Sequence, residues 1–258
     1  FKPDLIYLNN TWFKGNLGLF KIIKKNKIKT ILKIHNFRYL CTRHVTVKKH
    51  INGKNSCNMC GQSFSKFAIF NKYFSDSYLK SIGVLRYGLE YIKIIKNYPI
   101  DIFVLNNFHK QFLIDLGVNQ ERVRISYNPI KINDEIISSS NSNYVTYAGR
   151  ISEEKGLNEL LETWISAKVD NLILKIVGDG NLLDSLKSKY TNENVEFLGE
   201  KSQEETLEII KNSRAVITST KMYEGQPRLL CEASSFGIPS IFPNSGGLKE
   251  YFPEEYPL

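Results

Sequence analysis

Short apolar runs alternate with longer amphipathic stretches along the whole chain. In the first half, the apolar runs are typical of buried strands, and the lysine-rich stretches carry apolar residues at helical spacing. The predicted strands are 4–8, 30–34, 100–105 and 123–127, and the predicted helices are 17–27, 64–98 and 108–116.

The second half repeats this alternation more regularly. The predicted strands are 144–148, 172–177, 195–198, 215–218 and 239–242, and the predicted helices are 157–167, 182–190, 203–212 and 227–236. Strands that alternate with helices form βαβ units, so we expect an α/β fold with parallel sheets. Ligands of such sheets bind beyond the carboxyl ends of the strands, and glycines and charged residues follow several of the predicted strands.

A polar run near the middle predicts a boundary between two domains. Residues 138–143 read Ser-Ser-Ser-Asn-Ser-Asn, which is the composition of a linker. We therefore expect an N-terminal domain over 1–130, a linker over 131–143 and a C-terminal domain over 144–258.

Composition excludes several classes of protein. With 15 Phe, 14 Tyr and a hydrophobic share of 42%, the 258 residues are not those of a disordered chain, and 4 Cys are too few for a disulfide scaffold. No apolar run reaches the roughly 20 residues that a membrane-spanning helix needs. The chain opens at Phe1 without Met or a secretory leader, so we expect that it begins inside a longer protein.

The net charge of +9 averages two unlike halves. Residues 1–130 hold 22 basic and 6 acidic side chains, a net charge of +16, and residues 131–258 hold 13 and 20, a net charge of −7. Lysines interleaved with aromatic and aliphatic residues in the basic half favour contact with an anionic membrane surface. An ordinary solvated lysine face, or a nucleic-acid-binding module, would show the same excess of charge.

Two carboxylates, Glu224 and Glu232, stand eight positions apart across a predicted helix start. Pro227 suits the first turn of that helix, so Glu224 lies in the preceding loop and Glu232 inside the helix. The free N–H groups of such a start favour electron-rich ligand atoms. The alternative is an acidic residue near a helix N-terminus and an unrelated surface Glu.

Two cations, Arg150 and Lys155, flank another predicted helix start, where the helix macrodipole disfavours positive charge. A diphosphate held between them would remove this conflict. The alternative is that Ser152 caps the helix and two neighbouring glutamates offset the charge. His35, at the end of a predicted strand, is a weaker candidate for a site.

The cysteines allow two interpretations, a metal site or reduced structural thiols. Cys57 and Cys60 form a C-x-x-C pair, with Cys41 upstream and histidines between. Three Cys and one His would suit tetrahedral zinc, but the spacing matches no zinc ribbon or finger. Reduced structural cysteines are the other interpretation, and we expect no metal.

Together these motifs resemble the retaining glycosyltransferases of the GT-B fold, specifically family 4 (glycosyl transferases group 1), and among them enzymes that build bacterial surface polysaccharides. Glu224 and Glu232 match the E-x7-E motif of that family. The segment from Gly149-Arg150 to Lys155-Gly156 matches its diphosphate-binding segment, and Ile34-His35-Asn36 matches its strand-end histidine.

The resemblance implies a fold and a set of roles. The fold would be two Rossmann-like domains facing a cleft, and relative to that family the chain would be truncated at both ends. Arg150 and Lys155 would neutralise the donor diphosphate, and Glu232 would hold the ribose. Catalysis would rest on His35 and Glu224. The remaining implied positions are Gly225 and Gln226 at the donor sugar, and Gly199 and Glu200 near the nucleotide base.

The resemblance also implies partners. The substrates would be a UDP- or GDP-sugar and a saccharide or lipid-linked saccharide acceptor, with no cofactor, no metal and no nucleic acid. The protein would be cytoplasmic, or peripheral at the inner face of the membrane. The competing functions are a sugar-nucleotide epimerase of the same fold and, further off, a basic nucleic-acid-binding module.

Overall fold

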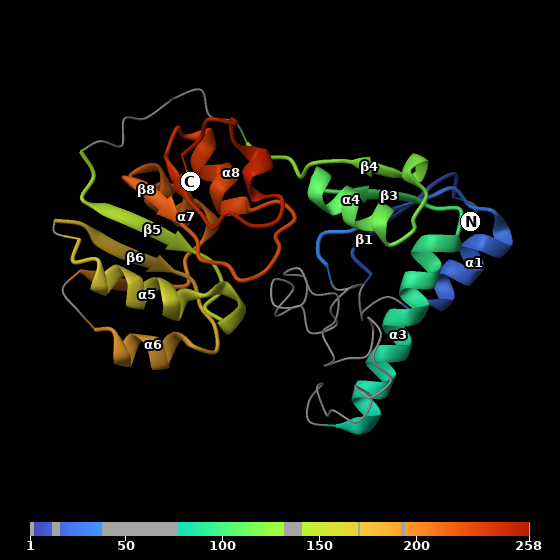
Figure 1. The fold of residues 1–258 in the computed structure, drawn as a ribbon, viewed down its shortest axis with the longest axis horizontal. Helices are drawn as coiled ribbons and strands as arrows, with labels where there is room; N and C mark the ends of the chain where they lie inside the picture. Colours follow the sequence, from blue (N-terminus) through green and yellow to red (C-terminus); the bar gives the residue numbers. More distant parts are fainter. Residues whose placement is uncertain are drawn as a thin grey trace. The chain divides into compact units, whose positions relative to one another are not determined.

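The computed structural model describes residues 3–11, 16–37, 77–131, 141–169, 171–191 and 194–257. The chain divides into two compact units. The first comprises Phe1–Asn128 together with Met222–Gln226, and the second comprises Pro129–Lys221 and Pro227–Leu258. Each unit contains one parallel sheet with its own helices (Figure 1).

The first unit is built on a four-stranded parallel sheet in the order β1-β2-β3-β4. Its strands are β1 (Ile6–Asn9), β2 (Thr30–Lys33), β3 (Asp101–Val104) and β4 (Val123–Ile125). Its helices are α1 (Gly18–Asn26), α3 (Tyr78–Asn97), α4 (Asn107–Asp115) and the 3-10 helix η2 (Gln120–Arg122).

The core of the first unit explains the local pattern of its helices. Along α1, Phe20 and Ile23 are buried while Lys21, Lys24 and Lys25 are exposed, so one apolar stripe packs inward. The long helix α3 buries Tyr91 in the same cluster, and α1 and α3 lie next to each other in Figure 1. The same cluster contains residues of β2 and β3, so these helices pack on the sheet.

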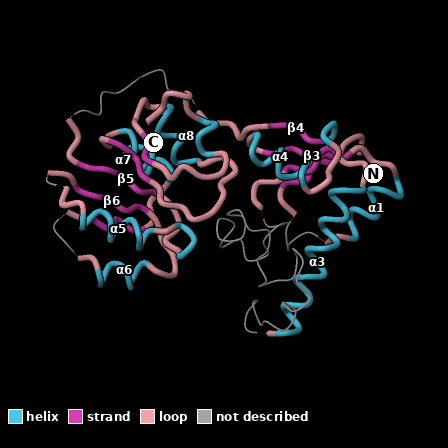
Figure 2. The backbone as a smooth tube through the Cα atoms, viewed as in Figure 1, coloured by secondary structure: helices cyan, strands magenta, loops and turns pink. Residues whose placement is uncertain are grey.

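The second unit is built on a five-stranded parallel sheet in the order β7-β6-β5-β8-β9. Figure 2 shows its strands surrounded by helices. The strands are β5 (Tyr144–Ala148), β6 (Ile173–Val177), β7 (Val195–Gly199), β8 (Ala215–Ile217) and β9 (Ser240–Ile241). The helices are α5 (Leu157–Ser166), α6 (Leu183–Lys189), α7 (Gln203–Lys211) and α8 (Arg228–Ser235), with the 3-10 helices η3 (Glu153–Lys155) and η4 (Leu248–Tyr251).

Helices cover both faces of this second sheet. On β5, Val145 and Tyr147 are buried in a cluster that includes residues of α5 and α6. Thr146, which points to the opposite face, is also buried and shares a 2.6 Å hydrogen bond with Ser213, just after α7. Burial on both faces is the usual state of a parallel sheet and explains why its strands read as continuous apolar runs.

The prediction of an α/β fold with parallel sheets is confirmed, because every strand pair that the structure describes is parallel. Of the helix predicted over 64–98, residues 64–76 lie outside the described residues, as do 132–140 of the predicted linker. Within the described ranges, no helix is both long enough and apolar enough to span a bilayer.

The start of α8 differs from the sequence prediction. Pro227 is the N-cap of α8, and the helix begins one residue later at Arg228. The start of α5 at Leu157 agrees with the prediction. Ser152 precedes the short 3-10 helix η3 without a side-chain capping bond, and Gly156, with a φ of +68°, separates η3 from α5. Arg150 and Lys155 therefore both precede α5.

Candidate functional site

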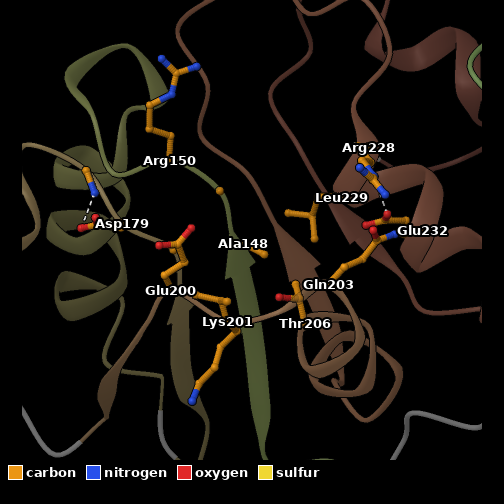
Figure 3. A pocket seen from close by; sticks show the side chains of 14 residues that line it. Ala148, Arg150, Asp179, Glu200, Lys201, Gln203, Thr206, Arg228, Leu229 and Glu232 are labelled. Atoms are coloured by element: carbon orange, nitrogen blue, oxygen red, sulfur yellow. Dashed lines mark hydrogen bonds and ion pairs between the residues drawn. The ribbon is translucent and has the colours of Figure 1, made fainter.

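A cavity of about 720 Å³ opens at the carboxyl ends of β5, β6 and β7 in the second unit. Figure 3 shows Glu200 and Glu232 on opposite sides of Ala148, the last residue of β5. The cavity is lined by Ala148, Gly149, Arg150, Val177, Gly178, Asp179, Gly180, Glu200, Lys201, Gln203, Thr206, Arg228, Leu229 and Glu232. Its position beyond the strand ends is where ligands of parallel α/β sheets bind.

Two glycines make the close contact between neighbouring strand-end loops possible. A Cβ on Gly178 would lie 2.0 Å from the carbonyl oxygen of Gly149, and a Cβ on Gly180 would lie 2.1 Å from that of Ile151. The same loops are joined by the hydrogen bond from Ile151 N to Asp179 O, at 2.8 Å. The Gly-Asp-Gly turn is therefore required by backbone packing, which shapes one wall of the cavity.

Arg150 lines this cavity and pairs with Glu154, with 3.5 Å between Nη1 and Oε1. Burial raises the pKa of Glu154, but a hydrogen bond from its own backbone amide and the charges of Arg150 and Lys155 outweigh burial and lower it overall. The carboxylate is thus ionised at neutral pH. Lys155 ends η3 and is not among the residues that line the cavity.

Glu232 lies a little over one turn into α8, with its carboxylate largely buried. Its Oε1 accepts a 2.7 Å hydrogen bond from Nε of Arg228 (Figure 3). Glu232 also lines a second cavity of about 220 Å³, shared with Gln203 and Arg228. Glu232 therefore lines two cavities of the second unit.

Glu200 reaches the cavity from the loop after β7, while Gly199 is absent from its lining. Gly199 has a φ of +69° and pairs with Val177 across a register shift in the sheet. This irregularity turns the chain so that Glu200 and Lys201 face the cavity.

His35 belongs to the first unit and lies two residues after the end of β2. Its Nε2 is hydrogen-bonded to Oδ1 of Asn9 at the end of the neighbouring strand β1. Burial, and then the positive charge of Lys33, lower the pKa of His35, so its ring is neutral at pH 7. Lys33 itself donates a 3.3 Å hydrogen bond to the carbonyl of Tyr127.

The segment Met222–Gln226, which carries Glu224, also belongs to the first unit. Gly225 packs so closely that an added Cβ would lie 2.8 Å from the carbonyl oxygen of His35 and 2.7 Å from Cδ1 of Leu105. Gln226 holds the main chain of Asn128 by two side-chain bonds, of 2.6 Å from Asn128 N and 3.1 Å to Asn128 O. The structure therefore brings Gly225, the residue after Glu224, against the backbone of His35.

Sequence reasoning did not identify two residues that hold this segment. Tyr223 packs against the rings of Phe37, Phe108 and Phe112, with centroids 4.8–6.2 Å apart. Asn106 is fully buried and donates to the carbonyls of Glu224 and Gly225. An Asn directly between a buried strand and a helix is a helix N-cap pattern, but that pattern does not reveal a contact with a segment about 120 residues away.

The possible metal site cannot be placed, because Cys41, Cys57 and Cys60 lie outside the described residues. Among the residues that the structure does describe, no group of three or more His, Cys, Asp or Glu side chains could hold a metal ion.

Comparison with known proteins finds a family match over the second half of the chain. Residues 130–256 match the family described as Glycosyl transferases group 1. The chain is similar to the amylovoran biosynthesis glycosyltransferase AmsD of Erwinia amylovora, with 32% identity over 103 residues, which are 38% of this chain and 28% of that protein. It is also similar to the lipopolysaccharide 1,6-galactosyltransferase of Escherichia coli K12, with 27% identity over 142 residues, 51% of this chain and 39% of that protein. The matches thus span well under half of these relatives.

Solved structures agree on the fold. HepE of Anabaena, solved in complex with UDP-glucose, has a TM-score of 0.66 at 16% identity, covering 97% of this chain and 62% of that one. The sucrose-phosphate synthase of Thermosynechococcus elongatus has a TM-score of 0.65 at 17% identity, covering 96% and 57%. At these identities the likeness shows the fold alone, which is the GT-B fold of glycosyltransferases, as the sequence predicted.

Proposed function

We propose, from the match of residues 130–256 to the group 1 glycosyltransferases, that this chain belongs to a retaining glycosyltransferase. It would move a hexose from a UDP- or GDP-sugar to a saccharide acceptor in bacterial surface polysaccharide synthesis. The observation that carries the proposal is the cavity at the strand ends of the matched segment, with Arg150, Glu200 and Glu232 in its lining. HepE, with the same fold, was solved with UDP-glucose, and AmsD is named for polysaccharide synthesis.

The cavity suits the nucleotide part of such a donor. Arg150 would form charge-assisted hydrogen bonds with the diphosphate, and Lys155 would add a second positive charge nearby. Glu232 would accept hydrogen bonds from the ribose hydroxyls. Glu200 and the backbone around Gly199 would lie next to the nucleotide base of the donor. Neutralising the departing diphosphate is the main electrostatic demand of the transfer, and here cationic side chains would meet it without a metal or cofactor.

The segment beside His35 suits the sugar part of the donor. Glu224, with the amides of Gly225 and Gln226, would hold the sugar hydroxyls. His35 would face the sugar as a neutral ring, because burial and Lys33 lower its pKa. Transfer with retention would follow a front-face course without a covalent enzyme intermediate. The paired carboxylates of glycoside hydrolases therefore have no counterpart in this proposal.

The basic first half suits an acceptor held at an anionic membrane surface. On α1, Lys21, Lys24 and Lys25 are exposed beside exposed Ile22, and Leu79 at the start of α3 is 84% exposed. Such a mixture favours peripheral contact with anionic lipid. The full-length protein should therefore co-sediment with vesicles rich in phosphatidylglycerol at low salt and be released as salt rises. Absence of co-sedimentation at low salt would contradict membrane contact and would indicate that these lysines form an ordinary solvated face.

A panel of nucleotide sugars tests the proposed donor site. Calorimetry of the full-length protein with UDP-glucose, UDP-galactose, UDP-N-acetylglucosamine and GDP-mannose should reveal binding of one nucleotide class. Glu232→Ala should weaken that binding about tenfold, because a hydrogen bond to a charged group contributes about 1.5 kcal/mol. Glu204→Ala, on the exposed first turn of α7 and outside the cavity lining, is the matched control and should bind normally.

Two results would contradict this proposal. One is that no member of the panel binds the wild-type protein. The other is that a donor sugar is epimerised in the absence of any acceptor, which would identify the sugar-nucleotide epimerase instead.

A further inference from the structure

Asn106 stands at the turn between β3 and α4, inside the first unit, and its side chain is completely buried. Its Oδ1 accepts a 2.7 Å hydrogen bond from the backbone N–H of His109, which caps the N-terminus of α4. Its Nδ2 donates to two main-chain carbonyls, that of Gly225 at 2.6 Å and that of Glu224 at 3.3 Å. Both amide protons and the amide oxygen are therefore used.

The two carbonyls that Asn106 holds belong to the residues proposed to contact the donor sugar. A buried amide with every polar atom bonded cannot rotate without leaving donors or acceptors unsatisfied, which is unfavourable in the protein interior. Two neighbouring contacts also restrain this segment. Gly225 packs against the carbonyl of His35, and the side chain of Gln226 is hydrogen-bonded to the main chain of Asn128. The peptide between Glu224 and Gly225 is thus tied to the strand-end loop that carries His35.

We propose that Asn106 is a positioning residue for sugar transfer: it fixes the main chain of Glu224 and Gly225 against His35 through the two hydrogen bonds of its side-chain amide. This inference rests on the proposed function, because it assigns the held segment to the donor sugar. Asn106 does not touch substrate and acts through Glu224 and Gly225. Transfer depends steeply on the placement of such groups, whereas the nucleotide cavity is lined entirely by residues of the second unit.

Asn106→Ser separates this positioning from capping. Serine caps a helix about as well as asparagine, so α4 keeps its N-cap, but the shorter hydroxyl cannot reach both carbonyls. Asn106→Asp keeps the size and the capping oxygen and replaces the two donors by an oxygen that faces two carbonyl oxygens. The matched control is Asn119→Ser, because Asn119 caps η2 through a 2.9 Å bond to Glu121 N and has no part in the held segment.

The measurements are calorimetric affinities for the free nucleoside diphosphate and for the nucleotide sugar, and turnover with the donor found in the panel. Both Asn106 variants should bind the free diphosphate within about twofold of wild type and lose about 10- to 100-fold in kcat, the effect of misplacing a reacting group by a fraction of an ångström to one ångström. The extra affinity of the sugar nucleotide over the free diphosphate should disappear as well. Asn119→Ser should behave as wild type in all three measurements.

Two outcomes would overturn the assignment of Asn106. In the first, both Asn106 variants turn over the donor at the wild-type rate. In the second, they lose diphosphate affinity and turnover in equal measure, which is the sign of a general folding role. Failure of the wild-type protein to bind any nucleotide sugar is a different result, because it removes the proposed function before any variant is compared.

Discussion

Replacing Glu224 by Gln is expected to reduce sugar transfer about 10²- to 10³-fold, the loss typical of removing one polar group that acts on the transition state. Affinity for the free nucleoside diphosphate should stay unchanged, because Glu224 belongs to the first unit and the nucleotide cavity is lined by residues of the second. Initial rates with the donor found in the panel, together with calorimetry of the diphosphate, measure both quantities.

The substitution isolates the charge of one side chain. Gln keeps the size of Glu224 and leaves intact the main-chain carbonyl that Asn106 holds. Glu121→Gln, an exposed carboxylate in η2 of the same unit, is the matched control and should transfer normally. Wild-type turnover in Glu224→Gln would remove this residue from the site, and equal losses of binding and turnover would place it at the nucleotide instead.

Lowering the pH from 7 to 5 is expected to cost the first unit about 2 kcal/mol of folding free energy through His109 alone. His109 is fully buried on α4 and stacked on Phe37, with ring centroids 4.2 Å apart. Burial, and then the charge of His35, lower the pKa of His109 to about 3. Between this value and the roughly 6.5 of an unfolded histidine, the unfolded state binds a proton that the folded state does not.

The sign of the pH effect follows from that difference. The contribution of His109 is complete above about pH 6.5 and falls by about 1.4 kcal/mol for each pH unit below it, down to the folded pKa. Urea unfolding at pH 7 and pH 5 should show the loss in the wild type and a loss smaller by about 2 kcal/mol in His109→Phe, which keeps an aromatic ring against Phe37 but cannot titrate. The same acid sensitivity in both proteins would contradict a neutral buried His109.

Local sequence patterns predicted the elements of the fold well. The strand over 144–148 has the predicted bounds, and α5, α6 and α7 end within one residue of their predicted ends. Apolar runs, helical spacing and capping residues act over a few residues, so they can be interpreted without the tertiary structure. The error at Pro227 lies at a helix start, where one residue of backbone conformation decides the boundary.

The sequence predicted which residues form the candidate site, but not which of them belong to the same unit of the fold. Arg150, Glu200 and Glu232 line one cavity because parallel strands bring their carboxyl ends to one edge, which the alternation of strands and helices already implies. Their roles at a donor nucleotide remain proposals. Nothing in the residues around Glu224 indicates that its segment belongs to the first unit, because that depends on packing with side chains about 115 residues earlier in the chain.

The sequence by itself therefore determined the class of fold, the parallel sheets and the residue types offered at the strand ends, since each follows from short-range periodicity and composition. The tertiary structure alone decided that Gly178 and Gly180 are required by neighbouring backbone, and that Gly225 abuts His35. It alone showed that one buried amide, that of Asn106, ties Glu224 and Gly225 to the loop after β3. These contacts join residues far apart in the chain, and only the folded path of the backbone brings them within reach.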